Sequence, residues 1–578
     1  MTKAKQTDPI IFLNDFRGKD FIGEWPTIPE LFNITVKRYP KNACFTDFEG
    51  PDGSKQTLTY SQVKENVTKL SEWMAAKGIV HGDRIAVSGK NSPEWATVYL
   101  AALYTGAIIC PIDYALHNSE TENLLNATKP KMFFVDSEKY DYFAQKKNSF
   151  KVFSLSPSYE KTYVYNLVAS KKVQVIPAVE NDTAAILFTS GTTGEPKGAM
   201  LSHKNLVSDC LIAQTHMNIF PTDVFYALLP IHHAYTMLAV FIEAISVGAE
   251  IVFGKSMAVS RLMKELKEGQ ITMLLGVPLL FNKLLSGIMK GIKAKGWFVY
   301  AMVRMLMGIS GFVKNVFRVN PGKSMFKAIL KQANIYSLRI AICGAGPLAP
   351  SVFKMYNQLG IDFVQGYGLT ETSPIVALNP IYKFKIQSVG SYFKGYMEMK
   401  ILNPDAEEIG EVCVRGPMVM QGYYNMAEET KKVITEDGWF KTGDLGWLDK
   451  EGYLMLSGRA KNMIVTAGGK NVYPEEIENA FQLCDDIGQI TVQGYNEVKN
   501  NAGELIEALI YPSDSLFARL KISRGDKLGE NAVEREVNEN VSKINKTLLP
   551  YQRITKVTIL EKPLEMTTTK KVKRHYKK

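Results

Sequence analysis

The chain has 578 residues, of which 46% are hydrophobic, and a formal net charge of +11. It is too long for one hydrophobic core, so we expect at least two domains, and the hydrophobic fraction is ordinary for a soluble globular protein. The six cysteines include no C-x-x-C pair, which argues against a disulfide framework or a zinc site and favours a reducing cytoplasm. The first apolar group, 10–13, is too short for a secretory signal, so export is not expected.

The first third of the chain alternates helix and strand signals. Apolar residues at helical spacing predict a helix over 63–74, and the run 84–88 predicts a short strand. Ser92 is expected to cap a helix over 93–104, with proline at its first position, and a strand follows over 107–112. This alternation predicts an α/β fold with mostly parallel sheets covered by helices.

The most informative segment is 188–198, where an apolar run ends in small hydroxyl residues, glycines and one lysine. Glycines let the backbone approach an anion, hydroxyls donate hydrogen bonds, and lysine adds a mobile positive charge, so the segment predicts a loop that grips a nucleotide triphosphate. The lysine follows a proline and precedes a glycine, which differs from the P-loop pattern. The candidate residues of this loop are Thr189, Ser190, Gly191, Thr192, Thr193, Gly194 and Lys197.

The net charge is concentrated in one region. Residues 269–361 contain twelve basic residues and no Asp or Glu, and an apolar run over 296–313 is interrupted there by Arg304. The run barely reaches the roughly 20 residues needed to cross a bilayer. Two interpretations stay open: a peripheral membrane contact on the inner face, or a solvated helical face over an internal core. Nucleic acid is not expected as a partner, because the chain has no RNA-recognition motif or aromatic platform.

Several motifs occur in one order at wide spacing: the loop up to residue 198, the run 366–372, the run 441–444, and Gly458 with Arg459. With them the chain resembles the adenylate-forming superfamily of acyl-CoA synthetases, adenylation domains and luciferases, over about 58–574. The segments 229–235 and 437–444 resemble most closely those of long-chain fatty acyl-CoA synthetases (AMP-forming). The resemblance implies a large adenylation domain, 1–458, with stacked sheets, and a small mobile α+β lid, 459–578, which begins with a helix over 474–483.

The family implies a ligase that uses ATP, Mg²⁺ and coenzyme A. A medium- or long-chain fatty acid is joined to the α-phosphate of ATP with loss of pyrophosphate, and the acyl group then passes to the thiol of coenzyme A. Two alternatives stay open: transfer to an acyl carrier protein, or activation of an aryl or other carboxylic acid. Because little covalent chemistry falls to the protein, its residues are expected to position the substrates and neutralise charge.

The resemblance also assigns roles at the phosphates. Lys197 and the loop hydroxyls would hold the β- and γ-phosphates. Glu371, next to Thr370, would bind Mg²⁺, which prefers oxygen ligands. Lys571 matches the lysine that bridges the carboxylate and the α-phosphate, although Lys570 stands where glycine is commonest, so it stays open whether Lys570 shares this work.

Other roles concern the nucleoside and the lid. Tyr367 is expected to stack on adenine, Asp444 and Arg459 to bind the ribose hydroxyls, and Lys461 to act as the hinge of domain rotation. The glycines beside Tyr367 are Gly366 and Gly368; the opposite wall is Gly344, Ala345 and Gly346; the loop at the thiol entrance is Gly468, Gly469 and Lys470.

The acid-binding part of the site is less clearly marked. Residues 232–242 contain no acid, so a substrate ammonium would be left unpaired and amino acids are disfavoured. Apolar residues in 237–242 and 272–280 line an acyl tunnel or belong to the core, and both interpretations stay open. The substrate-binding candidates are His233, Gly276 and Val277.

Overall fold

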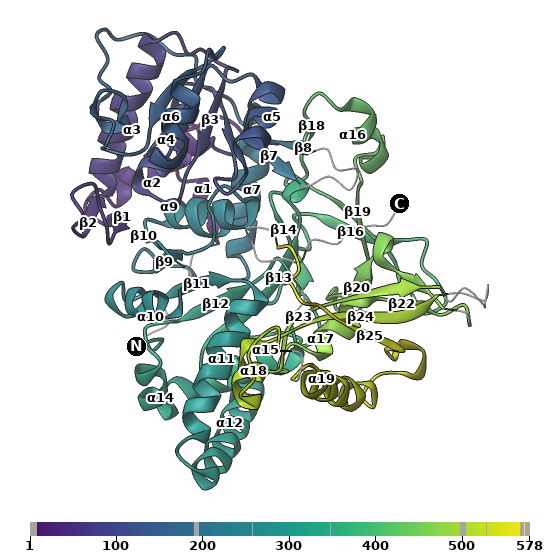
Figure 1. Cartoon of the computed structure of the whole chain (residues 1–578). Coiled ribbons are helices and arrows are strands. Elements are labelled where there is room, and N and C mark those ends of the chain that lie inside the picture. Colours follow the sequence, from purple (N-terminus) through teal and green to yellow (C-terminus); the bar gives the residue numbers. More distant parts are fainter. Residues whose placement is uncertain are drawn as a thin grey trace.

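The computed structural model describes residues 8–189, 196–256, 258–346, 348–466, 468–496, 504–526, 529–566 and 572. Two large sheets form its first part (Figure 1). Within the described residues the larger sheet has nine strands, in the order β15 (Ser391–Tyr392), β14 (Ile375–Leu378), β13 (Asp362–Gly368), β12 (Ile340–Cys343), β11 (Met273–Gly276), β9 (Val224–Ala227), β10 (Glu250–Phe253), β1 (Ala43–Asp47) and β2 (Gln56–Thr59). The second has seven, in the order β18 (Gly422–Tyr423), β8 (Lys197–Ser202), β7 (Thr183–Thr189), β4 (Ile108–Pro111), β3 (Arg84–Ser88), β5 (Met132–Val135) and β6 (Lys151–Ser154).

Both sheets are parallel in the middle and antiparallel at one or both edges. From β1 through β10, β9, β11 and β12 to β13 every pair of the larger sheet is parallel, as are the pairs from β6 to β7 in the second. Parallel strands need crossover connections, which the helices between them supply. The predicted α/β fold with mostly parallel sheets is confirmed.

Two helices lie between the sheets. α4 (Pro93–Tyr104) is almost wholly buried and contacts β3 and β4 on one side and β1 on the other; α7 (His203–Gln214) contacts β8 and β14 in the same way. The Ser92 side chain accepts a hydrogen bond from the backbone N–H of Trp95 at 3.2 Å, so the predicted cap is confirmed. α3 (Tyr60–Ala76) packs on α4 from outside and confirms the helix predicted over 63–74.

The last part of the chain has its own core. An antiparallel sheet of β16 (Glu398–Leu402), β17 (Gly410–Arg415), β19 (Phe440–Leu448) and β20 (Leu454–Arg459) precedes it. A separate cluster of buried residues between Ile464 and Ile554 then joins β21 (Ile464–Val465), β22 (Asn471–Val472), α17 (Pro474–Ala480), β23 (Ile487–Tyr495), β24 (Leu505–Pro512), α18 (Asp514–Leu520), α19 (Glu530–Asn545) and β25 (Lys556–Ile559). The helix predicted over 474–483 is three residues too long, because after Ala480 the backbone turns. The division at 458 and 459 stays a prediction.

A helical projection forms the lower end of the view in Figure 1. It consists of α11 (Pro278–Lys293) and α12 (Trp297–Phe317), and α12 packs against both α11 and α15 (Pro350–Leu359). The other described α-helices are α1 (Pro9–Leu13), α2 (Ile28–Arg38), α5 (Asn118–Thr128), α6 (Ser137–Ala144), α8 (Ala234–Thr236), α9 (Glu243–Val247), α10 (Val259–Glu268), α13 (Gly322–Met325), α14 (Lys327–Gln332) and α16 (Ala427–Val433).

Candidate functional site

A cleft of about 2240 Å³ lies between the strand ends of the first part and the C-terminal core. Fifteen of the predicted positions line it: Thr189, Lys197, His233, Val277, Gly344, Ala345, Gly346, Gly366, Tyr367, Gly368, Thr370, Glu371, Asp444, Arg459 and Lys461. Gly276, Gly468, Gly469 and Lys470 are described but do not line it. Ser190, Gly191, Thr192, Thr193, Gly194 and Lys571 lie outside the described residues.

The predicted phosphate loop connects two paired strands. β7 ends at Thr189 and β8 begins at Lys197, and these two residues are partners in the antiparallel ladder. The Thr189 hydroxyl donates to the backbone oxygen of Lys197 at 3.4 Å. The two ends of the loop are thus fixed on the rim of the cleft.

Lys197 has a counterion that the sequence did not reveal. Its Nζ forms an ion pair with Glu429 of α16 and lies 5.2 Å from the ring centre of Tyr423. The hydrogen bond from Lys197, followed by one from Lys432, lowers the pKa of Glu429 to about 2. The mobile positive charge expected at Lys197 is therefore held by a carboxylate, and that expectation was wrong.

Glu371 lies beside this ion pair. The Tyr423 hydroxyl donates to Glu371 Oε1 at 2.9 Å, so the tyrosine links the lysine and the carboxylate. Glu371 belongs to the short helix η4 (Thr370–Thr372), and its backbone oxygen accepts from Met420 N–H at 2.9 Å. A carboxylate that faces a cleft next to a phosphate-binding lysine suits a hard cation such as Mg²⁺.

The turn that carries Glu371 depends on a glycine. A Cβ atom on Gly368 would lie 1.7 Å from the backbone oxygen of Pro374, which no side chain allows. This close approach brings the end of β13 against β14 and fixes Tyr367 and Glu371 on either side of the turn. The glycine of the run 366–372 is therefore required for packing.

On the nucleoside side, Asp444 is the centre of a hydrogen-bonded group. The Tyr367 hydroxyl donates to its Oδ2 at 2.7 Å, and Arg459 Nε lies 2.9 Å from its Oδ1. Asp444 and Arg459 are partners on the neighbouring strands β19 and β20. Burial, and then the charge of Asp444, raises the pKa of Tyr367 well above its usual value. The structure brings together all three residues that the family resemblance assigns to adenine and ribose.

The opposite wall follows β12. Gly344 packs against Tyr235: a Cβ atom there would lie 2.7 Å from the ring. The Tyr235 hydroxyl donates to the backbone oxygens of Gly276 and Ile342, each at 3.3 Å. Gly276 thus supports the tyrosine through its backbone and does not line the cleft, contrary to the expected contact with substrate.

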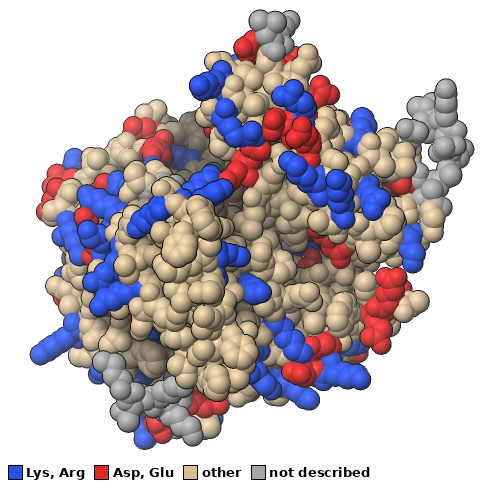
Figure 2. Space-filling view, turned by 90° about the horizontal axis from the view of Figure 1, so that it is seen from below, with Lys and Arg blue, Asp and Glu red and all other residues tan. Residues whose placement is uncertain are grey.

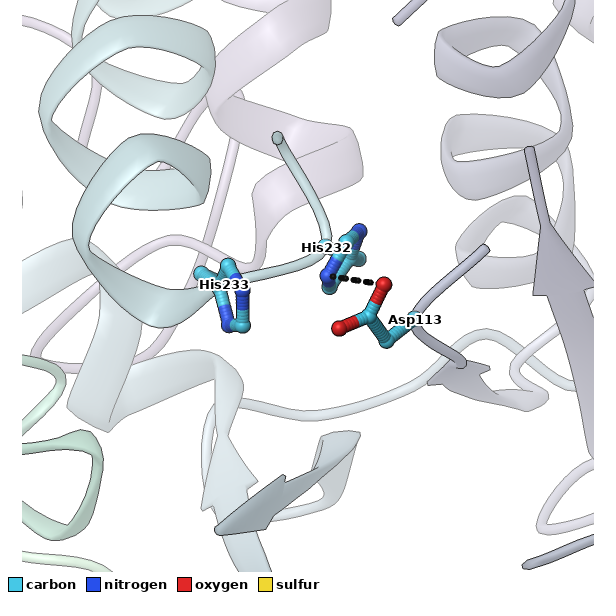
Figure 3. Close-up of side chains that lie close together, drawn as sticks. All are labelled: Asp113, His232 and His233. Carbon is cyan, nitrogen blue, oxygen red and sulfur yellow. Dashed lines mark ion pairs between the residues drawn. The ribbon is translucent and has the colours of Figure 1, made fainter. Parts of the chain in front are cut away.

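A cluster of His232, His233 and Asp113 lies at the same end of the cleft (Figure 3). The buried His232 has Nε2 at 3.5 Å from Asp113 Oδ1, whereas His233 lines the cleft. One donor atom from each residue lies within 4.8 Å of the others, and these donor types suit a transition metal. The ion pair alone accounts for the burial of His232, since a buried imidazole needs a polar partner.

The apolar stretches considered for an acyl tunnel are mostly core. Residues 237–242 form the π-helix η3 (Met237–Ile242) and are all buried, and Ala239 is the member that lines the cleft. In 272–280 the strand β11 is buried, while Val277, Pro278 and Leu279 face the cleft. The described acyl-binding surface is therefore confined to the start of α11 and a small part of η3.

The C-terminal core touches α11 across the cleft. Asp485 accepts a hydrogen bond from Ser286 at 3.1 Å and pairs with Lys290 at 3.1 Å. Val572, next to Lys571 in the sequence, lines the cleft, whereas Lys470 pairs with Glu407 at 3.6 Å outside it. In this arrangement the terminal segment, and not the loop 468–470, faces the other groups of the cleft.

Comparison with known proteins gives the family. A family model described as AMP-binding enzyme matches residues 32–424, which is more than half of the chain. The chain belongs to the AMP-binding enzyme family. It is similar to a long-chain-fatty-acid–[acyl-carrier-protein] ligase of Arabidopsis thaliana (25% identity, 99% of this chain and 88% of the relative) and to a long-chain-fatty-acid–CoA ligase of Drosophila melanogaster (27%, 79% and 72%).

The fold agrees with solved structures. ATP-bound MatB from Rhodopseudomonas palustris has a TM-score of 0.72 at 24% identity and covers 95% of this chain, which in turn covers 97% of it. The predicted family, the α/β fold and the enzyme class, an AMP-forming ligase, are confirmed. Tyr423 and Glu429 were not predicted, because each lies far along the chain from the motif that it contacts and belongs to no chemical pattern.

Proposed function

We propose that the protein activates a medium- or long-chain fatty acid with ATP and transfers the acyl group to coenzyme A. A carboxylate oxygen attacks the α-phosphorus and pyrophosphate leaves; the thiol sulfur then attacks the acyl carbon, the C–O bond to AMP breaks, and AMP leaves. The observation that carries the proposal is the convergence of two groups on one cleft, Tyr367 with Asp444 and Arg459, and Lys197 with Glu371. The fatty-acid relatives support the choice of substrate.

Each group has a proposed role in the first half-reaction. Asp444 accepts from the ribose hydroxyls, Tyr367 stacks on adenine, and Lys197 takes up the charge of the leaving phosphates. Glu371 would hold Mg²⁺, which supplies further charge neutralisation at the phosphates. Lys571 would bridge the attacking carboxylate and the α-phosphate.

The second half-reaction would use a rotated arrangement of the part 459–578. Lys461, in η5 (Ala460–Asn462), lies between the two cores and is the proposed hinge. Rotation would bring the loop 468–470 to the thiol and withdraw Lys571. Replacing Lys461 with Pro should impair one half-reaction selectively, and normal rates of both would contradict the hinge.

The acceptor and the location are part of the proposal. Coenzyme A is the leading acceptor, and one relative named as an acyl-carrier-protein ligase makes carrier protein the second candidate. We place the enzyme in the cytoplasm, attached peripherally to the inner membrane face through the basic region 269–361. That region has twelve basic residues and no acid, which suits an anionic surface.

A pyrophosphate-release assay over a panel of carboxylic acids tests the function. The acids should include fatty acids of increasing chain length, aryl acids and amino acids, each with ATP and Mg²⁺, and with coenzyme A or acyl carrier protein. We expect release with fatty acids and thioester formation with coenzyme A. No AMP with any acid would contradict the proposal, and a product formed with carrier protein alone would select the second candidate.

A further inference from the structure

Helix α12 exposes a continuous apolar face. The exposed residues Phe298, Met302, Met305, Ile309, Phe312 and Val316 are 42–66% accessible. At about 100° per residue, they fall within an arc of about 80° on one side of the helix. Clusters of large exposed apolar side chains mark a surface that another body covers.

The opposite side of α12 packs on the protein. Val303, Met307, Ser310 and Lys314 are buried, and the helix contacts α11 and α15. Lys314 Nζ donates to Asp362 Oδ1 and Asn357 Oδ1, each at 2.7 Å. By length and mean hydropathy, 1.2, the helix is able to cross a membrane, but 22% of its most apolar window is buried in the protein. A helix held along one side in this way lies in a membrane surface, because crossing would need lipid contact all round.

The charges beside this face select the kind of surface. Not every basic residue of 269–361 is available, since Lys314 pairs with Asp362, Arg339 with Asp223 and Lys290 with Asp485. Lys293 and Lys295, in the turn before α12, and Arg304 on its flank are exposed. Figure 2, which views the molecule from this end, shows a broad tan area with blue side chains around it.

We propose that the exposed face of α12 inserts into the surface of an anionic lipid bilayer, with Lys293, Lys295 and Arg304 at the headgroups. The partner is a membrane because the face combines large apolar side chains with cations and no acid of its own region. Trp297, which is 79% exposed at the first turn, lies where interfacial tryptophan is favoured.

The position of α12 links the membrane to the cleft. α11 contacts α12 and also lines the cleft through Leu279, Asn282, Lys283 and Ser286. A bound bilayer would therefore lie one helix away from the cleft wall. This step rests on the proposed function: an acid with a long chain partitions into lipid, so the enzyme would take its substrate from the bilayer that holds it.

Flotation of the full chain with vesicles tests the insertion. Vesicles of phosphatidylcholine are compared with vesicles that also contain phosphatidylglycerol, at low and high salt. We expect binding to the anionic vesicles, weakened by salt, and quenching of Trp297 fluorescence by brominated lipid that is lost in Trp297→Phe. The double variant Met305→Ser with Phe312→Ser should lower the partition coefficient at least about tenfold, because it removes two of the largest inserted side chains.

Matched variants separate insertion from general effects. Ile22→Ser with Val168→Ser removes residues that are 92% and 71% exposed elsewhere, and should bind as the wild type does. Lys293→Gln with Lys295→Gln should lose binding to anionic vesicles, unlike Lys171→Gln with Lys450→Gln. Thermal unfolding, and AMP formation with a water-soluble acid, should stay unchanged in the α12 variant.

Three outcomes would overturn the inference. They are a wild type that binds no vesicles, an α12 variant that binds like the wild type, and a dimer in solution that the α12 variant abolishes, since a second copy would then cover the face. If vesicle binding is present but no acid gives AMP, the proposed function fails while the membrane surface stands.

Discussion

Replacing Asp444 with Asn is the sharpest test of the cleft. The side chain is nearly buried and has two partners, Tyr367 at 2.7 Å and Arg459 at 2.9 Å. Asparagine keeps the shape and one acceptor oxygen but removes the negative charge. If Asp444 accepts from the ribose hydroxyls, the variant binds the nucleotide more weakly both before and in the transition state.

The expected size follows from the strength of one charged hydrogen bond. Hydrogen bonds to charged groups contribute about 1.5–3 kcal/mol, and each 1.4 kcal/mol is about tenfold in an equilibrium constant. The KM for ATP should therefore rise roughly 10- to 150-fold in Asp444→Asn. ATP–pyrophosphate exchange measures this best, because it reports the first half-reaction and does not depend on the acceptor.

Glu398→Gln is a matched control on the same sheet. Glu398 of β16 pairs with Arg415 of β17 at 2.7 Å, as Asp444 of β19 pairs with Arg459 of β20, but neither Glu398 nor Arg415 lines the cleft. We expect its KM for ATP to stay close to that of the wild type. A change below about threefold in Asp444→Asn, against the roughly tenfold minimum of a charged hydrogen bond, or an equal loss in the control, would refute the ribose role.

Lys571→Ala should slow acyl-adenylate formation by roughly 10²- to 10³-fold, as expected for one preorganised donor, and spare thioester formation from supplied acyl-adenylate; equal loss of both steps would contradict its role. Gly368→Ala should unfold at a lower temperature and lose activity, because its Cβ atom would lie 1.7 Å from Pro374 oxygen, whereas Gly291→Ala, an exposed site on α11 with nothing nearby, should be neutral or stabilising; a normal melting temperature for Gly368→Ala would show that the turn relaxes. Burial raises the pKa of Glu243 from 4.5 to about 8, so the folded state binds the extra proton. Its contribution to stability is therefore fully present below about pH 4.5 and falls as the pH rises towards 8, by a few kcal/mol in order of magnitude, and Glu243→Gln should show a flatter urea midpoint between pH 5 and 8; parallel pH profiles of variant and wild type would exclude Glu243 as the cause.

The parts of the fold that the sequence predicted are those with a local physical cause. Ser92 followed by proline marks a helix start, and α4 begins there. Apolar spacing gave α3, and the run 84–88 is β3 in the structure. The helix predicted over 474–483 ended early because the Gln482 side chain accepts from the Ala349 backbone at 2.7 Å, a contact 133 residues away that no local pattern contains.

The candidate site divides in the same way. Tyr367, Asp444 and Arg459 were found together because their motifs prescribe residue types for nucleotide chemistry, and the pairing of β19 with β20 brings two of them into contact. Gly276 was placed on the cleft surface, yet its backbone oxygen supports Tyr235 behind that surface. Sequence spacing shows which residues approach a ligand, but not which of their atoms faces it.

The pairing of Lys197 shows where such reasoning ends. A phosphate-binding lysine needs only a positive charge at a defined place, so its residue type and flanking glycines are visible in the sequence. Its counterion Glu429 is 232 residues away on the short helix α16 and needs only a carboxylate within reach. The chain has 58 acidic residues, and nothing local distinguishes this one. Chemistry that fixes a residue type leaves a pattern in the sequence, whereas a contact set by proximity alone is revealed only by the folded chain.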